Sequence, residues 1–277
     1  MEITDIHGTV TLSNGVKMPY LGLGVFKSRD GAEVMNAVSY AFEAGYRHID
    51  TAAVYRNEAG VGEAIKNHPL DRTEVFITSK VWNSDQGYDS TIKAFYESLE
   101  RLGTDYLDLY LVHWPVAGKF KDTYKALETL YEEGKVKAIG VSNFLAHHLD
   151  ELLESAKIRP MVNQIEYHPH LTQADLIQKC FDLNIRPEAW SPLMQGQIFD
   201  IKDLQKLTNK YDKNVAQIVL RWNLQKGVIT IPKSVNRQRI HSNAEIFDFV
   251  ISDEDMKHID HLNQNQRVGA DPDNFNF

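Results

Sequence analysis

Leu107-Asp108-Leu109-Tyr110-Leu111-Val112-His113 is an apolar, strand-like run that ends in an imidazole. Two other runs close in the same manner, His48–Asp50 in a carboxylate and Val75–Lys80 in an ammonium group. Tyr55 lies five residues beyond the first of these, in what should be a loop. Core packing alone does not place ionisable groups at successive strand ends, because a buried charge is costly unless it is compensated. The pattern indicates strands whose ends gather groups suited to proton transfer.

Similar runs recur along the chain at intervals of about 25 to 33 residues, with a longer gap of about 40 before the last. We expect strands at Tyr20–Val25, Arg47–Ala52, Val75–Lys80, Leu107–His113, Lys137–Asn143, Met161–Glu166, Arg186–Ser191 and Val228–Ser234. The segments between them are amphipathic and predict helices at Ala32–Ala44, Thr91–Leu102, Asp122–Glu133, Leu145–Ala156 and Thr172–Leu183. The long gap predicts two helices, Ile201–Tyr211 and Val215–Gln225. Another pair, Arg239–Phe247 and Asp253–Leu262, is expected near the C-terminus.

Eight strands that alternate with helices favour an α/β fold, a (β/α)8 TIM barrel, over an open doubly wound sheet. An N-terminal β-hairpin, Thr9–Leu12 with Val16–Met18, should precede the barrel, because Asn14-Gly15 suits a tight turn. The extra C-terminal helices should follow it. We see no linker or shift in composition, and therefore expect a single domain over residues 1–277. The spacing of Thr172 and Asp175 predicts a helix cap.

The chain has 277 residues, of which 30 are basic and 38 acidic, for a net charge of −8. This balance argues against a sequence-independent nucleic-acid binder and leaves room for a local phosphate pocket. The single cysteine cannot form an intrachain disulfide, which fits the reducing cytoplasm. Neither a signal peptide nor an apolar run of about 20 residues is visible, so we expect a cytoplasmic protein without a membrane partner.

In a parallel barrel the active site lies at the C-terminal ends of the strands, where Asp50, Lys80 and His113 would be neighbours. The competing interpretation is a simple ion pair between Asp50 and Lys80 in the core. Tyr55 favours catalysis, because a nearby ammonium group stabilises a phenolate and should lower the high pKa of the phenol. We therefore predict a proton donor aimed at a developing alkoxide.

A carbonyl that is protonated on oxygen needs a hydride on carbon, which raises the question of a nicotinamide site. The Rossmann fingerprint is absent: Gly60–Ile65 lacks the third small residue and follows a loop, and Gly22-Leu23-Gly24 does not continue. We interpret these glycines as turn or close-approach positions. Ile231–Asn236, with Arg239 at a helix start, offers a cation, a hydroxyl and free backbone N–H groups to an anion. A solvated basic turn is the alternative.

The sequence resembles the aldo-keto reductase family over nearly its whole length. Seven ordered motifs carry the resemblance: Gly45–Ala52 with Tyr55, Ile77–Trp82, Asp105–Tyr110 leading to His113-Trp114-Pro115, Gly140–Phe144, Asn163–Glu166, Ser191–Leu193 and Ile231–Ser234. The overall pattern is most similar to bacterial glyoxal and methylglyoxal reductases and to the 2,5-diketo-D-gluconate reductases.

The resemblance implies a barrel closed by a hairpin, bound NADPH or NADP+, and a catalytic tetrad of Asp50, Tyr55, Lys80 and His113, with Tyr55 as general acid. It implies that the cofactor is bound by Gly24, Val25, Phe26, Ser142, Asn143, Gln164, Trp190, Ser191, Leu193, Lys233, Ser234, Val235, Asn236, Arg239 and Asn243. Within that set, Trp190 would stack on the nicotinamide, and its carboxamide would be held by Ser142, Asn143 and Gln164. The 2′-phosphate would be bound by Lys233, Ser234, Asn236 and Arg239. The substrate would lie among Phe26, Tyr55, Trp82, His113 and Trp114.

Two departures from larger relatives concern the substrate pocket. Only a short connection follows Pro115, and the C-terminal tail is modest, so we expect an open pocket with broad tolerance for small carbonyls. We expect no metal site, because neither His147-His148 nor His168-Pro169-His170 comes with a full ligand set.

The sequence thus predicts an NADPH-dependent reductase of small aldehydes, ketones or dicarbonyls, acting as a monomer. One alternative is a sugar ketone reductase of the 2,5-diketogluconate type. A non-catalytic NADPH-sensing subunit, and a barrel lyase or isomerase without redox chemistry, are the rivals from other classes.

Overall fold

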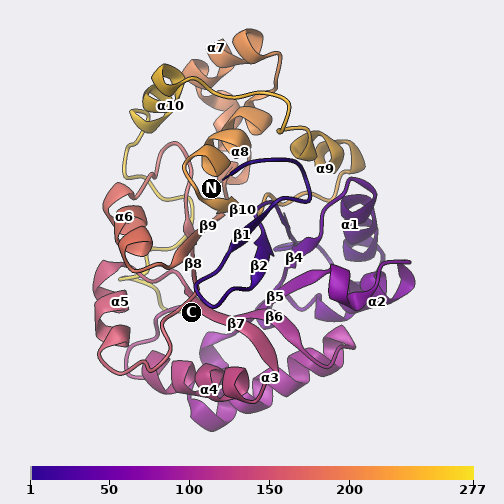
Figure 1. Ribbon diagram of the computed structural model, residues 1–277, viewed down its shortest axis with the longest axis vertical. Helices are drawn as coiled ribbons and strands as arrows, with labels where there is room; N and C mark the ends of the chain where they lie inside the picture. Colours follow the sequence, from indigo (N-terminus) through magenta and orange to yellow (C-terminus); the bar gives the residue numbers. More distant parts are fainter. Residues whose placement is uncertain (1) are drawn as a thin grey trace.

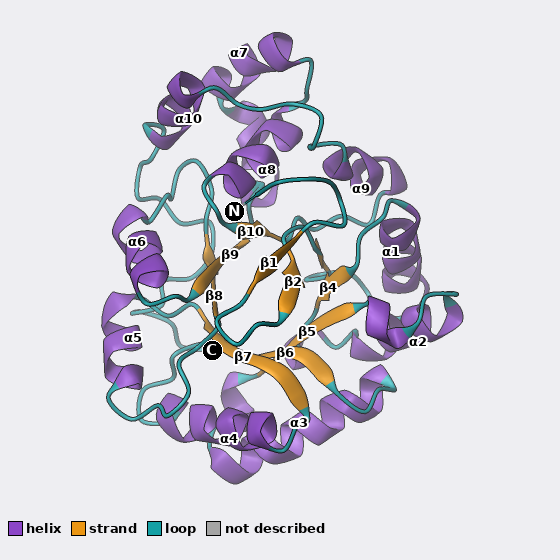
Figure 2. Ribbon diagram, viewed as in Figure 1, coloured by secondary structure: helices purple, strands orange, loops and turns teal. Residues whose placement is uncertain are grey.

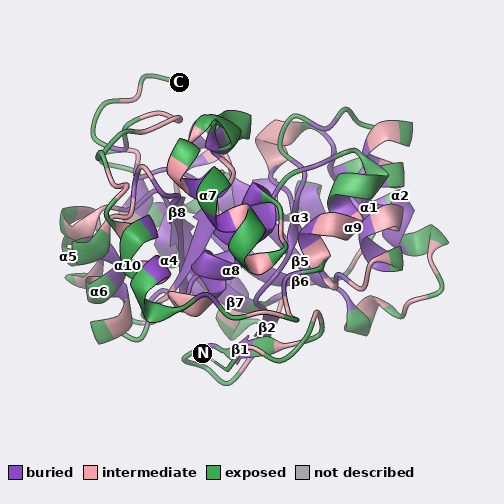
Figure 3. Cartoon of the chain, turned by 90° about the horizontal axis from the view of Figure 1, so that it is seen from above, coloured by how far each residue is buried: buried purple, intermediate pink, exposed green. Residues whose placement is uncertain are grey.

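The computed structural model describes residues 2–277, and its first regular element is the expected hairpin. Strands β1 (Thr9–Thr11) and β2 (Lys17–Pro19) pair antiparallel, with Val10 opposite Met18. Gly15 takes a φ of +90° in the turn between them, which a residue without a Cβ adopts at little cost. The hairpin lies across one mouth of the strand array, on the side opposite the C-terminal tail (Figures 1 and 3).

Eight parallel strands follow and form one sheet. They are β3 (Leu23–Gly24), β4 (His48–Asp50), β5 (Phe76–Val81), β6 (Leu107–Val112), β7 (Val136–Ser142), β8 (Val162–Glu166), β9 (Arg186–Trp190) and β10 (Ile229–Thr230). Each strand pairs with the next in chain order. Parallel bridges from Leu21 to Thr230 and from Gly24 to Lys233 join the first strand to the last. This curled sheet confirms the predicted (β/α)8 architecture.

Helices surround the strands and cover their outer face (Figure 2). In chain order they are α1 (Ala32–Glu43), α2 (Glu58–Asn67), α3 (Tyr88–Leu102), α4 (Phe120–Glu132), α5 (Ala146–Leu153), α6 (Ala174–Asp182), α7 (Lys202–Tyr211), α8 (Val215–Gln225), α9 (Arg237–Ala244) and α10 (Asp253–Asp260). Because both faces of the sheet are covered, β5 and β6 are buried at every position. The predicted strands and the nine predicted helices are confirmed, with ends that differ by a few residues.

Helix α2 was not predicted, because Gly60 and Gly62 lower the helix propensity of this segment. Packing explains why the segment is helical all the same. A Cβ on Gly62 would lie 2.2 Å from the carbonyl oxygen of Leu102, and one on Gly60 would lie 2.5 Å from Cγ1 of Val34. The two glycines therefore let α2 approach α1 and the end of α3 closely, which confirms them as close-approach positions.

The predicted cap of α6 is wrong. Gln173, not Thr172, is the residue before the first turn, and its φ is +43°. Its side-chain amide donates to the carbonyl oxygen of Glu166 (2.6 Å), while the backbone N–H of Thr172 donates to Asn263 (3.1 Å). One bond reaches the end of β8 and the other the start of the tail, and these contacts decide how the chain enters the helix.

Residues 263–277 form a tail without a helix or an extended strand. Figure 3 shows this tail on the side of the barrel opposite the hairpin. Backbone N–H groups of Val268 and Gly269 donate to the side chain of Glu166, so this part of the tail lies at the carboxyl end of β8. Within residues 2–277, none of the helices is both long enough and apolar enough to cross a bilayer.

Candidate active site

A buried ion pair lies where β4 and β5 end. Nζ of Lys80 donates to Oδ1 and Oδ2 of Asp50 at 2.8 and 2.9 Å, and to the carbonyl oxygen of Thr51 at 2.8 Å. Burial lowers the pKa of Lys80, but the negative groups around it, Asp50 first among them, together hold that pKa above its usual range. Lys80 is therefore a charged ammonium group, and its positive charge and the negative charge of Asp50 compensate each other.

The Tyr55 hydroxyl lies beside this pair. Tyr55 ends the short 3-10 turn η1 (Ala53–Tyr55) that follows β4, and its oxygen is 3.5 Å from Nζ of Lys80. Burial raises the pKa of Tyr55, and Asp50 adds to that rise while Lys80 opposes it. The expectation that Lys80 would lower this pKa overall is therefore wrong. The reason is that burial penalises the phenolate more than one ammonium group, itself neutralised by Asp50, can compensate.

His113 follows β6 and completes the group predicted from the strand ends. Its ring meets those of Tyr55 and Trp82 edge-on, with centroids 5.8 and 5.1 Å apart. Burial, with a smaller effect of Lys80, holds the pKa of His113 well below its usual range, so the ring is neutral at pH 7. Its Nδ1 has no hydrogen-bond partner among residues 2–277. The four predicted residues are thus brought together around one point.

Aromatic rings surround this point. Phe26, half exposed, lies 4.9 Å from the Tyr55 ring, and Trp82 and Trp114 lie at the ends of β5 and β6. Two rings of the tail complete the enclosure: Phe277 stacks on Trp82 at 5.8 Å, and both Phe277 and Phe275 pack against Trp114.

The open pocket stays a prediction, because Phe26 and Phe277 are both half exposed. The modest tail is long enough to cross the barrel end and bring aromatic rings onto the predicted substrate side. Sequence reasoning missed these residues, although two phenylalanines in an otherwise polar tail were a usable signal.

A hydrogen-bonded row of amides and a hydroxyl adjoins the tetrad, at the ends of β7 and β8. Nδ2 of Asn143 donates to the carbonyl oxygen of His113 (3.0 Å) and to Oγ of Ser142 (3.1 Å). Oγ of Ser142 donates to the backbone oxygen of Gln164 (2.9 Å). The indole N–H of Trp190 donates to Oδ1 of Asn143 (2.9 Å). These residues, predicted to face the nicotinamide end of a cofactor, form one connected network.

Gln164 connects that network to the ion pair. Its side-chain nitrogen donates to Oδ2 of Asp50 at 2.7 Å and to Oε2 of Glu188 at 2.8 Å. Both amide hydrogens are thereby engaged, which leaves the amide oxygen of Gln164 as the acceptor towards a ligand. Glu188 was missed by sequence reasoning. The sequence did contain a signal for this residue, because Glu188 is an acidic residue inside the buried part of the strand Arg186–Trp190.

The predicted phosphate cradle lies between β10 and α9. Lys233, Val235 and Arg239 are exposed, whereas Ser234 is buried and its hydroxyl accepts the backbone N–H of Asn236 (3.1 Å). Asn236 in turn caps α9 by accepting the N–H of Arg239 (3.1 Å). Burial of its stem lowers the pKa of Lys233, and Glu33 opposes this. Two cations at a helix N-terminus fit a phosphate group.

The remaining predicted cofactor residues connect this cradle to the tetrad. Gly24 bridges Lys233 across the closed sheet, and a Cβ there would lie 2.9 Å from the carbonyl oxygen of Ile231. Val25 donates its N–H to the carbonyl oxygen of Asp50 (3.0 Å). Ser191 and Leu193 form the turn after β9, with Ser191 at a φ of +48°, and Asn243 is buried within α9.

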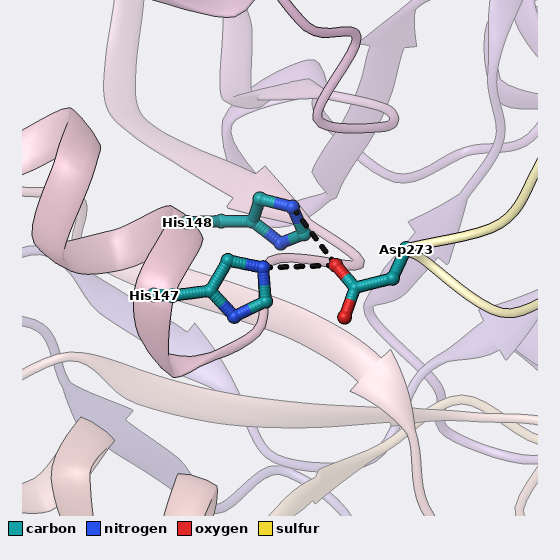
Figure 4. A group of neighbouring side chains, drawn as sticks. All are labelled: His147, His148 and Asp273. Atoms are coloured by element: carbon teal, nitrogen blue, oxygen red, sulfur yellow. Dashed lines mark hydrogen bonds and ion pairs between the residues drawn. The ribbon is translucent and has the colours of Figure 1, made fainter.

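Outside this site, three side chains join the tail to α5 (Figure 4). Nε2 of His147 lies 2.8 Å and Nε2 of His148 3.4 Å from Oδ1 of Asp273. Nδ1 of His148 accepts the backbone N–H of Leu145 (3.2 Å), so its Nε2 carries the proton and faces the carboxylate. This orientation suits a hydrogen-bonded connection between tail and helix. It does not suit metal ligation, which needs a bare nitrogen.

Comparison with known proteins agrees with this geometry. Residues 20–264 match the model of the aldo/keto reductase family. The chain is 58% identical over 274 residues to glyoxal reductase of Bacillus subtilis, covering 99% of both chains. It is 44% identical over 270 residues to methylglyoxal reductase DkgA of Escherichia coli, covering 96% of this chain and 97% of that protein.

Solved structures give the same result. The crystal structure of Bombyx mori aldo-keto reductase in complex with NADP superposes with a TM-score of 0.90 at 38% identity, covering 98% of this chain and 97% of the other. The fold is therefore shared with a solved protein whose sequence differs at most positions. The chain belongs to the aldo/keto reductase family.

Proposed function

We propose that this protein reduces small aldehydes, ketones or dicarbonyl compounds of the glyoxal and methylglyoxal type to alcohols, with NADPH as the hydride source. The observation that carries the proposal is the Tyr55 hydroxyl, placed 3.5 Å from the ammonium group of Lys80 and beside a neutral His113. The glyoxal and methylglyoxal reductases among its relatives support this substrate class.

The four polar residues would act on the carbonyl oxygen. Neutral His113 can donate a hydrogen bond to that oxygen and orient it, because an imidazole keeps one N–H when uncharged. Tyr55, whose pKa burial raises, is protonated at neutral pH and can give its proton to the alkoxide that develops. Lys80 then stabilises the phenolate left behind, and Asp50 keeps Lys80 charged and in place.

NADPH would lie along the carboxyl end of the barrel and supply a hydride to the carbonyl carbon. Asn143, Gln164 and Trp190 would hold its nicotinamide end, because the amide oxygen of Gln164 is the acceptor that remains after both N–H groups are engaged. Lys233 and Arg239 would bind the phosphate that distinguishes NADPH from NADH. Gly24, Ser191 and Leu193 line the stretch between these two ends in our proposal.

The aromatic enclosure supports a small substrate. Trp82 meets the ring of His113, and Trp114 and Phe277 continue this group of rings away from the tetrad. Such surfaces accept a short aldehyde or dicarbonyl readily, whereas most hydroxyl groups of a sugar ketone would meet ring carbons, with only the indole N–H groups of Trp82 and Trp114 as donors. This favours the glyoxal type over the 2,5-diketogluconate type.

The test is steady-state reduction followed by loss of NADPH absorbance. Purified protein should reduce glyoxal and methylglyoxal faster than 2,5-diketogluconate. Tyr55→Phe should lower kcat by about 10³-fold or more while NADPH affinity, measured by fluorescence quenching, changes less than about threefold. Tyr96→Phe, which removes a hydroxyl from an exposed ring on α3, is the matched control and should leave kcat unchanged.

A wild-type protein that binds NADPH and reduces no carbonyl would support the sensing alternative and contradict the proposal. Full activity of Tyr55→Phe would contradict the role of Tyr55 as proton donor.

A further inference from the structure

Glu188 is a buried carboxyl group that the proposed chemistry does not use. It lies in β9 and is joined to Asp50 through the side-chain amide of Gln164, and its side chain is fully shielded from solvent. Oε2 accepts one hydrogen bond, from Nε2 of Gln164 at 2.8 Å. Oε1 has no hydrogen-bond partner among the residues that the structure describes. A carboxylate with one neutral donor is poorly solvated, because an ionised carboxyl group usually accepts several bonds.

The charged groups around Glu188 do not compensate an ionised form. On β4, Nε2 of His48 lies 3.8 Å from Oε1, but burial and Lys80 lower the pKa of His48 to about 3, so that ring is neutral. Asp50, also on β4, shares the amide of Gln164 and repels a second negative charge. Lys80 on β5 is the nearest source of positive charge, and Asp50 already neutralises it.

Tyr55, in the turn after β4, faces Glu188 as well. An ionised Glu188 would oppose loss of the Tyr55 proton, since it raises the pKa of the phenol. Within residues 2–277, no lysine or arginine nitrogen lies within 4.0 Å of the Glu188 carboxyl group. The surroundings therefore favour a protonated Glu188.

We propose that Glu188 is a positioning residue of the site: while protonated it holds Gln164 and leaves Asp50 as the only charged partner of Lys80, and when it ionises at alkaline pH it impairs reduction. The inference rests on the proposed function of Tyr55 and Lys80.

The direction of the pH effect follows from the charges. Burial first, and repulsion by Asp50 second, raise the pKa of Glu188 to about 8. Below that pH the carboxyl group is neutral and Tyr55 can deliver its proton. Above it, a second negative charge is buried beside that of Asp50, and Tyr55 holds its proton more tightly. The kcat for reduction should therefore fall as the pH rises past about 8.

Glu188→Gln tests this, because glutamine has nearly the same shape and cannot ionise. Its kcat should be compared with that of the wild type between about pH 6.5 and about pH 9. The ratio of variant to wild-type kcat should rise about tenfold over this range, since one pH unit above its pKa about nine-tenths of Glu188 is ionised. A structural role alone would shift kcat by the same factor at every pH.

Glu128→Gln is the matched control. Glu128 is a buried carboxylate of α4 that accepts the backbone N–H groups of Lys157 and Ile158, away from the site. This variant should keep the wild-type pH profile. A wild-type profile in Glu188→Gln, with an active wild-type enzyme, would overturn the inference.

Infrared difference spectroscopy between about pH 7 and about pH 9.5 gives a readout that needs no activity. The wild type should lose the carbonyl band of one protonated carboxylic acid, and Glu188→Gln should lack that change. Absence of the band from the wild-type difference spectrum would also overturn the inference. Failure of the wild type to reduce any carbonyl would instead refute the proposed function, and the infrared result would still decide whether Glu188 ionises.

Discussion

Replacing Lys80 by methionine should destabilise the protein far more than removal of an ordinary surface lysine. Lys80 is fully buried, and its three N–H groups are directed at both oxygens of Asp50 and at the carbonyl oxygen of Thr51, all within 2.9 Å. Lys80→Met leaves the Asp50 carboxylate buried with Gln164 as its main donor. Breaking one side of a buried ion pair costs about 3–5 kcal/mol.

The double variant Asp50→Asn/Lys80→Met should recover most of that loss. The asparagine amide oxygen that the first change introduces can still accept the hydrogen bond from Gln164. No charge then remains without a partner, so we expect a free energy of unfolding within about 2 kcal/mol of the wild type. Activity should stay lost, because the proton donor has no ammonium group beside it.

Calorimetry measures the effect as a change in Tm. For a chain of this size about 1 kcal/mol corresponds to about 2–4 °C, so Lys80→Met should lower Tm by about 10 °C. Lys179→Met, which removes a partly exposed ion pair with Asp150 at 2.6 Å, should lower it by less than about 4 °C. If Lys80→Met has the same Tm as the wild type, or if the double variant is no more stable than Lys80→Met, the reasoning is refuted.

Two further predictions concern the packing and the cofactor. Gly62→Ala should lower the free energy of unfolding by about 3 kcal/mol in urea denaturation, because its Cβ would lie 2.2 Å from a backbone oxygen. Gly118→Ala, at a φ of +73° but in open space, should cost about 1 kcal/mol. Arg239→Ala should weaken NADPH binding at least about tenfold in fluorescence titrations and NADH binding little. Equal losses for both cofactors would contradict the phosphate assignment.

Most of the barrel could be predicted from the sequence, because each strand is a local apolar run and each helix a local amphipathic one. The helix α2 could not, since its stability comes from close contacts of Gly60 and Gly62 with α1 and α3, which local propensity does not contain. The same holds for the start of α6, where a bond from Gln173 to the end of β8 replaces the expected cap. Tertiary contacts decided both cases.

The candidate site divides in the same way. Asp50, Lys80 and His113 were predictable as a group because parallel strands bring their carboxyl ends to one side of the sheet. The pKa of Tyr55 was not, since its direction depends on how deeply the phenol is buried. Phe277 was missed because its position follows from the path of the tail, and that path is fixed by contacts with residues more than 100 positions earlier in the chain.

The position of Tyr55 on a turn, rather than on a strand, requires a separate explanation, because a proton donor must be held as firmly as the groups around it. Asn57 provides this. Its buried side chain donates to the carbonyl oxygens of Val25 and Ser28, each at 2.9 Å, and accepts the hydroxyl of Thr51 at 2.8 Å. These bonds tie the turn at both ends, to the end of β4 and to the segment after β3. The turn that carries the phenol is therefore held in place by the segments next to β3 and β4. These bonds help to fix the 3.5 Å distance between the Tyr55 hydroxyl and Nζ of Lys80.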